Sequence, residues 1–213
     1  CRGNDPGAVF DGIGELGVRR IELVPVVHED PGILPGETDL AAYRDFIEGW
    51  VDDRLAAIPG AEPPELVRLS NTARRVMGYD VKQVACGAGR NFLGIGPEGG
   101  IYPCFRFVGL AEYRLGDLGR GADRNSMAAF QQKAGRPFEQ RPDCAACWAA
   151  PLCGGPCFAC SEMFGPGEGA PIALHCDYTR ADAHAAVRLV QRLRDAAPER
   201  LLGLLAEVDL DIE

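Results

Sequence analysis

The cysteines of this 213-residue chain are gathered after residue 85, and only Cys1 precedes them. Five of the nine fall within the seventeen residues 144–160. Secreted proteins that depend on disulfides usually spread their cysteines through a short chain. Thiolates that converge on a metal are more often crowded in this way. The sequence therefore favours metal-bound cysteines over disulfides.

The crowded block begins with the spacing Cys-x2-Cys-x5-Cys-x3-Cys. A gap of two residues lets both sulfurs of one turn face a single centre, as in many zinc and iron–sulfur sites. Prolines and glycines between the cysteines favour sharp bends and a close approach of the backbone to an inorganic core. Once Cys1 is set aside, eight cysteines remain, enough for two sites of four thiolates: Cys86, Cys104, Cys144, Cys147, Cys153, Cys157, Cys160 and Cys176.

The two upstream cysteines enclose a predicted β-hairpin. Residues 91–104 (NFLGIGPEGGIYPC) alternate in the manner of two short strands, with residues 97–100 as the turn. Because a hairpin folds the chain back on itself, we expect Cys86 and Cys104 to approach each other. Aromatic side chains flank the cysteines, and we expect them to shield a metal from water: Tyr102, Phe105, Phe107 and Trp148.

Simpler interpretations of these residues stay open. A zinc ion would make the block a non-catalytic interaction module, and an iron–sulfur electron carrier is a further alternative. Cys160 fits a small buried hydrophobic residue as well as it fits a ligand. His175 is adjacent to Cys176 and could hydrogen-bond to a cluster, although a surface role is the simpler expectation. His28 and His184 follow no ligand pattern.

The order of the cysteines resembles a known domain. Cys-x12-Gly-x4-Cys, then Cys-x2-Cys-x5-Cys-x3-Cys, then Cys176 is similar to the seven-cysteine SPASM domain of radical S-adenosylmethionine peptide maturases, over residues 86–176. The segments CGAGRNFLGIGPEGGIYPCFRFVG and CWAAPLCGGPC look closest to the thioether-forming members. Those members mature six-cysteine (SCIFF) peptides and the small subunit of quinohaemoprotein amine dehydrogenase.

The resemblance implies two auxiliary [4Fe–4S] clusters with interleaved ligands. Cys86, Cys104 and Cys157 would bind the first cluster. The ligands of the second would be Cys144, Cys147, Cys153 and Cys176. The first cluster then lacks a fourth ligand, which is either Cys160 or the thiolate of a substrate. An open position is favoured here, because related maturases include such sites and act on cysteine-bearing peptides.

The resemblance also implies parts that these 213 residues do not contain. The Cys-x3-Cys-x2-Cys motif of the superfamily, which binds a third [4Fe–4S] cluster and S-adenosylmethionine, is absent from the sequence. The chain begins with Cys-Arg-Gly-Asn, so we interpret it as the carboxy-terminal part of an enzyme and expect it to be inactive alone. The implied partners are a precursor peptide and an electron donor such as flavodoxin or ferredoxin.

The expected fold is α/β, the end of a partial (β/α)6 barrel followed by a loop-rich α+β SPASM domain. The predicted boundaries are 1–79 for the barrel portion, 80–178 for the cluster domain and 179–213 for terminal helices. We predict helices at residues 9–16, 38–58, 65–77, 126–133, 180–197 and 198–208, and a strand buried on both faces at residues 20–27. His28, Glu29 and Asp30 follow that strand, where barrel enzymes place site residues, although a solvated loop is the simpler expectation.

The bulk composition excludes some classes of function. The formal net charge of -9 argues against broad binding to nucleic acid or to anionic membranes, which requires a basic face. No apolar run approaches the roughly 18 residues of a membrane helix. The start of the chain does not resemble a signal peptide, and we expect a cytoplasmic location.

Overall fold

The computed structural model describes residues 3–58, 61–79 and 81–206. These residues form two compact units. We call the first, drawn from Cys1–Val81 and Ala173–Glu213, the helical unit, and the second, Lys82–Ile172, the cysteine-rich unit. Cys1, which the sequence analysis set aside from the ligand sets, lies outside the described residues. In the part of the chain that is described, no helix is long and apolar enough to cross a membrane.

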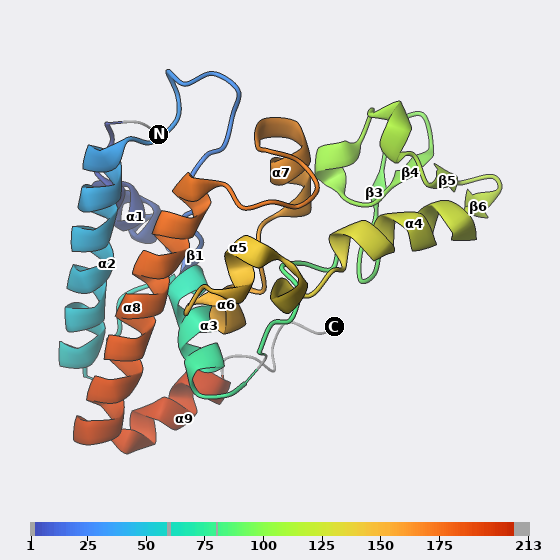
Figure 1. The fold of residues 1–213 in the computed structure, drawn as a ribbon. Helices are drawn as coiled ribbons and strands as arrows, with labels where there is room; N and C mark the ends of the chain where they lie inside the picture. Colours follow the sequence, from blue (N-terminus) through green and yellow to red (C-terminus); the bar gives the residue numbers. More distant parts are fainter. Residues whose placement is uncertain (1–2, 59–60, 80, 207–213) are drawn as a thin grey trace. The chain divides into compact units, whose positions relative to one another are not determined.

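The helical unit contains five helices and a pair of short strands among its described residues (Figure 1). In chain order these are α1 (Pro6–Glu15), β1 (Arg20–Ile21), α2 (Glu37–Ala56), β2 (Glu65–Leu66), α3 (Val67–Val76), α8 (Ala173–Ala196) and α9 (Pro198–Ala206). β1 and β2 pair in parallel, and α2 is the crossover between them. This arrangement is a short parallel β–α–β unit, of which the sequence predicted the first strand and the helix but not β2.

Packing in the helical unit follows the apolar stripe of α2. Tyr43, Ile47, Trp50 and Val51 recur at helical spacing and are buried on one face of that helix. They pack in one cluster with buried residues of α3 and α8: Leu69, Ala73, Tyr178, Ala185, Leu189 and Leu193. The beginning of α2 is fixed by Asp39, whose carboxylate accepts a hydrogen bond from the Gly36 amide at 2.7 Å.

The predicted strand at residues 20–27 was wrong in length and in burial. β1 ends at Ile21, and the chain continues as a loop in which Val24 is 54% exposed. β2 provides only two residues to pair with, and Pro25 has no amide hydrogen to donate. The predicted helix at 65–77 was also too long, because Glu65 and Leu66 form β2 before α3 begins.

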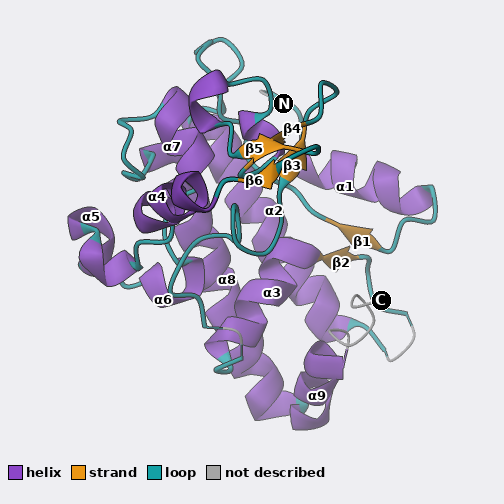
Figure 2. Ribbon diagram, turned by 90° about the vertical axis from the view of Figure 1, so that its right-hand side faces the viewer, coloured by secondary structure: helices purple, strands orange, loops and turns teal. Residues whose placement is uncertain are grey.

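The cysteine-rich unit is built on a small antiparallel sheet (Figure 2). β3 (Gly94–Ile95) and β4 (Gly100–Tyr102) form the predicted hairpin. Two strands that the sequence analysis missed, β5 (Gly116–Asp117) and β6 (Gly121–Ala122), extend the sheet in the order β3-β4-β5-β6.

Short helices complete the cysteine-rich unit. α4 (Arg124–Ala134) is the helix predicted at 126–133, and its N-cap Asp123 accepts a hydrogen bond from the Ser126 amide at 2.8 Å. The helices that follow are α5 (Pro142–Ala145), α6 (Ala150–Cys153) and α7 (Phe158–Phe164). Three-residue 3-10 turns precede them: η1 (Phe105–Phe107), η2 (Ala111–Tyr113) and η3 (Phe138–Gln140). The cysteine block is thus interrupted, as expected from its prolines and glycines.

The last long helix differs from its prediction in a way that matters for Cys176. α8 begins at Ala173 rather than at residue 180, so Cys176 lies on this helix and in the helical unit. Val187 on α8 is exposed, whereas Leu189 and Leu193 are buried. α9 is described to Ala206, and the last residues of the predicted helix at 198–208 lie outside the described part.

Candidate metal centre

Seven cysteines lie in the cysteine-rich unit, spread over several short elements and turns. Cys104 caps η1 directly after the hairpin, and Cys86 lies in the exposed loop before the hairpin. Cys157 caps α7, and Cys160 lies within that helix. Cys144 lies in α5, Cys153 ends α6, and Cys147 lies between those two helices. All are free thiols, and no disulfide links the described cysteines.

A first group of thiols gathers around Cys104. Burial raises the pKa of Cys104, and the charges of Cys157 and Cys86 raise it further, whereas the amides of Arg106 and Phe107 oppose this. Cys157 also packs against Cys104 in the apolar cluster of this unit. These three cysteines are the same residues that the SPASM resemblance assigns to one cluster, although Cys86 lies far from Cys157 along the chain.

Backbone contacts bring the segment of Cys86 to Cys104. The Gly89 amide donates a hydrogen bond to the Pro103 carbonyl at 2.8 Å, directly before Cys104. Across the hairpin, a Cβ on Gly94 would lie 2.7 Å from the Cys104 carbonyl carbon. The absence of a side chain at Gly94 therefore allows the two hairpin arms to approach at the position where Cys104 leaves the sheet.

Cys160 belongs to the first group by its contacts. Its thiol donates a hydrogen bond to the Cys157 sulfur, and this bond is the largest cause that lowers the pKa of Cys157 to about 6. The same bond, together with burial, raises the pKa of Cys160. Arg106 favours the charged form of both thiols. The sequence analysis did not identify Arg106. The one feature that could have indicated it is the position of a positively charged residue two residues after Cys104.

A second group contains Cys144, Cys147 and Cys153. Burial raises the pKa of Cys144, and the charges of Cys153 and Cys147 raise it further. The turn between the first two is closed by a hydrogen bond from the Cys147 amide to the Cys144 carbonyl at 2.9 Å. The Cys153 thiol donates to the Gly155 carbonyl at 3.2 Å.

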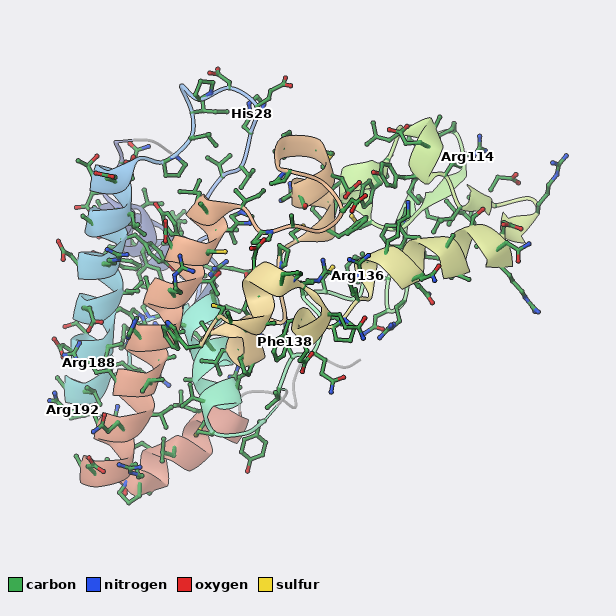
Figure 3. All side chains as sticks on the ribbon, viewed as in Figure 1. His28, Arg114, Arg136, Phe138, Arg188 and Arg192 are labelled. Atoms are coloured by element: carbon green, nitrogen blue, oxygen red, sulfur yellow. The ribbon has the colours of Figure 1, made fainter. Side chains whose placement is uncertain are left out.

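A buried arginine holds the second group in place. The Arg141 guanidinium donates to the carbonyls of Gly169 at 2.6 Å, of Arg136 at 3.1 Å and of Ala134 at 3.1 Å. The Arg141 carbonyl also accepts a hydrogen bond from the Cys144 amide at 2.9 Å. Its positive charge partly opposes the rise in the pKa of Cys144 that burial causes. Figure 3 labels Arg136 and Phe138 on the segment between α4 and α5 that Arg141 supports. Sequence reasoning missed Arg141, since nothing local marks an arginine as buried.

Gly154 lets α6 pack against the segment that leads to Cys86. Its φ of 77° lies in the left-handed region, and it ends the helix that carries Cys153. A Cβ at this position would lie 2.6 Å from the Val84 carbonyl oxygen and 2.8 Å from the Lys82 Cβ. The Lys82 amide in turn donates to the Pro151 carbonyl at 3.3 Å. The absence of a side chain at Gly154 thus allows close packing between the segment that carries Cys153 and the segment that leads to Cys86.

We expect Gly154→Ala to lower the free energy of unfolding by about 3 kcal/mol, from left-handed strain and backbone overlap together. Urea denaturation measures this change. Gly109→Ala is the matched control, because Gly109 has a φ of 89° but a Cβ added there would meet nothing within 4 Å. The control is expected to lose only about 1 kcal/mol, and equal losses in both variants would contradict the close packing at Gly154.

The remaining sequence candidates lie elsewhere. Cys176 is half-buried on α8 of the helical unit, and its assignment to the second cluster rests on sequence order. His28, Glu29 and Asp30 lie on the exposed loop between β1 and α2, where Figure 3 labels His28. The His28 Nδ1 accepts a hydrogen bond from the Asp30 amide at 2.9 Å, which is a local turn contact.

Both groups consist of cysteine thiols, and the thiolate is the side-chain ligand that iron–sulfur clusters take. Within the described ranges, no group of three or more His, Cys, Asp or Glu side chains is placed to hold a metal ion. Thiolates on one tetrahedral ion lie ~3.8 Å apart, given metal–sulfur bonds of about 2.3 Å. A four-iron core instead takes one thiolate on each iron and needs a wider spacing. The free thiols of both groups come from distant segments, and the charge of Arg106 acts on the first group and that of Arg141 on the second.

Comparison with solved structures identifies the fold. The structure of anSMEcpe with bound AdoMet aligns with a TM-score of 0.63 at 16% identity, over 98% of this chain and 57% of that one. Native anSMEcpe with bound AdoMet and Kp18Cys peptide aligns with a TM-score of 0.61 at 16% identity, over 88% and 53%. The fold is similar to that of anSMEcpe.

Sequence comparison adds a relative without assigned activity. An uncharacterized protein of Archaeoglobus fulgidus is 36% identical over 173 residues, which cover 76% of this chain and 40% of that protein. No protein-family model matches the chain. The chain thus spans only 40% of this relative and about half the length of anSMEcpe.

Proposed function

We propose that this chain is the auxiliary-cluster part of a radical S-adenosylmethionine enzyme that modifies a ribosomally made peptide. The observation that carries the proposal is the division of the thiols of the cysteine-rich unit into two groups. Cys86, Cys104 and Cys157 form one group, and Cys144, Cys147 and Cys153 form the other. This division supports the ligand sets that the SPASM resemblance implies.

In this proposal two [4Fe–4S] clusters are bound, the first by Cys86, Cys104 and Cys157 and the second by Cys144, Cys147, Cys153 and Cys176. When bound, such clusters supply one-electron chemistry. The protein orients the thiolates through the hairpin, the Arg141 hydrogen bonds and Gly154. Buried aromatic residues, among them Phe107 and Phe158, exclude water next to Cys104.

The similarity in fold supports the wider part of the proposal. anSMEcpe has been solved with bound AdoMet and a peptide. By analogy, the remainder of the enzyme binds S-adenosylmethionine and a third cluster, and the substrate is a precursor peptide. A flavodoxin or ferredoxin would deliver electrons. The proposed reaction is thioether formation. Its support is the amino-acid sequence around the cysteines rather than the fold.

Metal analysis tests the proposal. We expect the chain, purified and reconstituted without oxygen, to be brown and to contain roughly eight iron and eight sulfide ions. A colourless chain with stoichiometric zinc would contradict the proposal and indicate a zinc-bound interaction module. The chain could bind the iron while the full-length enzyme leaves cysteine-bearing precursor peptides unmodified. That result would instead indicate an electron carrier.

A further inference from the structure

Cys157 and Cys160 occupy the first turn of the same helix. Cys157 is the N-cap of α7, and Cys160 follows three positions later inside it. The turn is closed by a hydrogen bond from the Ser161 amide to the Cys157 carbonyl at 3.0 Å. Residues three apart on a helix share one face, with Cβ atoms about 5–6 Å apart. This separation suits two thiolates on neighbouring irons of one cluster.

Cys160 faces the first group of thiols rather than solvent. Its side chain is buried, with 2% of the residue exposed. The thiol hydrogen-bonds to the Cys157 sulfur, and the charge of Cys104 acts on it as well. Cys104 and Cys157 pack in one apolar cluster with Phe158 and Ala159, the two residues between Cys157 and Cys160. The charge of Cys86 also acts on Cys104.

We propose that Cys160 is the fourth protein ligand of the first cluster, so that this cluster has no open position for a substrate thiolate. This inference rests on the proposed function and changes the choice that the sequence favoured. A buried thiol on the same helical turn is present at a high effective concentration, whereas a substrate thiol must first bind. Ligation replaces the hydrogen bond to Cys157 by an iron–sulfur bond and releases the thiol proton.

The proposal has one structural requirement and one functional consequence. The two hydrogen-bonded sulfurs must separate to reach different irons, and rotation about χ1 of one cysteine is sufficient. With Cys86, Cys104, Cys157 and Cys160 as ligands, the first cluster would supply electron transfer and would not bind the peptide. The substrate cysteine would then be held by other groups of the enzyme.

Cyanide binding to the reconstituted 213-residue chain tests the assignment. After reduction and addition of 13C-labelled cyanide, we expect wild type to show no 13C coupling by electron–nuclear double resonance. We expect Cys160→Ala to keep the iron and to show a new coupling from one unprotected iron. Equal coupling in both proteins, or no coupling in either at equal iron content, would overturn the proposal.

Two more variants separate ligation from packing in case Cys160→Ala loses the first cluster. Cys160→Ser offers an oxygen ligand of similar size, and Cys160→Val fills the site without a ligand atom. Loss of half the iron in Cys160→Val with retention in Cys160→Ser supports ligation. Full iron in Cys160→Val without cyanide coupling assigns Cys160 to packing and overturns the proposal. A wild-type chain without iron would contradict the proposed function itself, before any variant is compared.

Discussion

Replacing Cys153 by alanine is expected to halve the bound iron, from roughly eight ions to about four per chain. Cys153 ends α6 and influences Cys144, so its loss removes one thiolate from the second group and leaves the first group intact. Because cluster binding and folding are coupled, the melting temperature should fall as well. Iron and sulfide analysis together with thermal denaturation under anaerobic conditions measures both effects.

The control for Cys153→Ala is Cys1→Ala, which removes a cysteine that belongs to neither proposed ligand set. Its iron content should equal that of wild type. Cys147→Ala should reproduce the Cys153→Ala result, because both residues belong to the second group. In Cys153→Ala, unchanged iron and an unchanged melting temperature, without a new cyanide coupling from an unprotected iron, would refute the ligand assignment.

The second large effect is expected at Asp182, in the helical unit. Asp182 is 1% exposed, and its carboxylate accepts hydrogen bonds from the Tyr43 hydroxyl at 2.7 Å and from the Arg68 Nε. Burial and the negative charge of Asp182 raise the pKa of Tyr43. The carboxylate thereby connects α8 with α2 and α3. We expect Asp182→Ala to lower the free energy of unfolding by about 3 kcal/mol, because it removes one partner of a buried ion pair.

Urea denaturation with a matched surface variant tests this prediction. Asp177→Ala lies on the same helix and removes an ion pair with Arg180, but Asp177 is 41% exposed in its side chain. Its loss should be below about 0.5 kcal/mol. The double variant Arg68→Met with Asp182→Leu should recover much of the stability, since neither charge is then left alone. Equal losses in Asp182→Ala and Asp177→Ala would show that the buried pair contributes little.

Helices with a clear cap and a regular apolar stripe could be predicted from the sequence. α2 has such a stripe, although its N-cap residue is Gly36, and α1 was predicted although Val9 and Leu16 are exposed. The hairpin of β3 and β4 was predicted from the proline and glycines at its turn. The two-residue strands could not be predicted in this way. β2, β5 and β6 are too short to show a period, and they exist because distant segments supply their hydrogen-bond partners.

The local order of the cysteines was determined by the sequence itself. The spacing within residues 144–160 fixes which thiols can share a turn, because a gap of two or three residues leaves little freedom. The same spacing does not reveal which distant thiols meet. Only the tertiary structure decided that Cys160 lies beside Cys157 and Cys104, and that Arg141 is buried next to Cys144. The physical reason is that such contacts depend on hairpin closure, on close backbone packing at Gly94 and Gly154, and on burial, which arise from the whole cysteine-rich unit rather than from neighbouring residues.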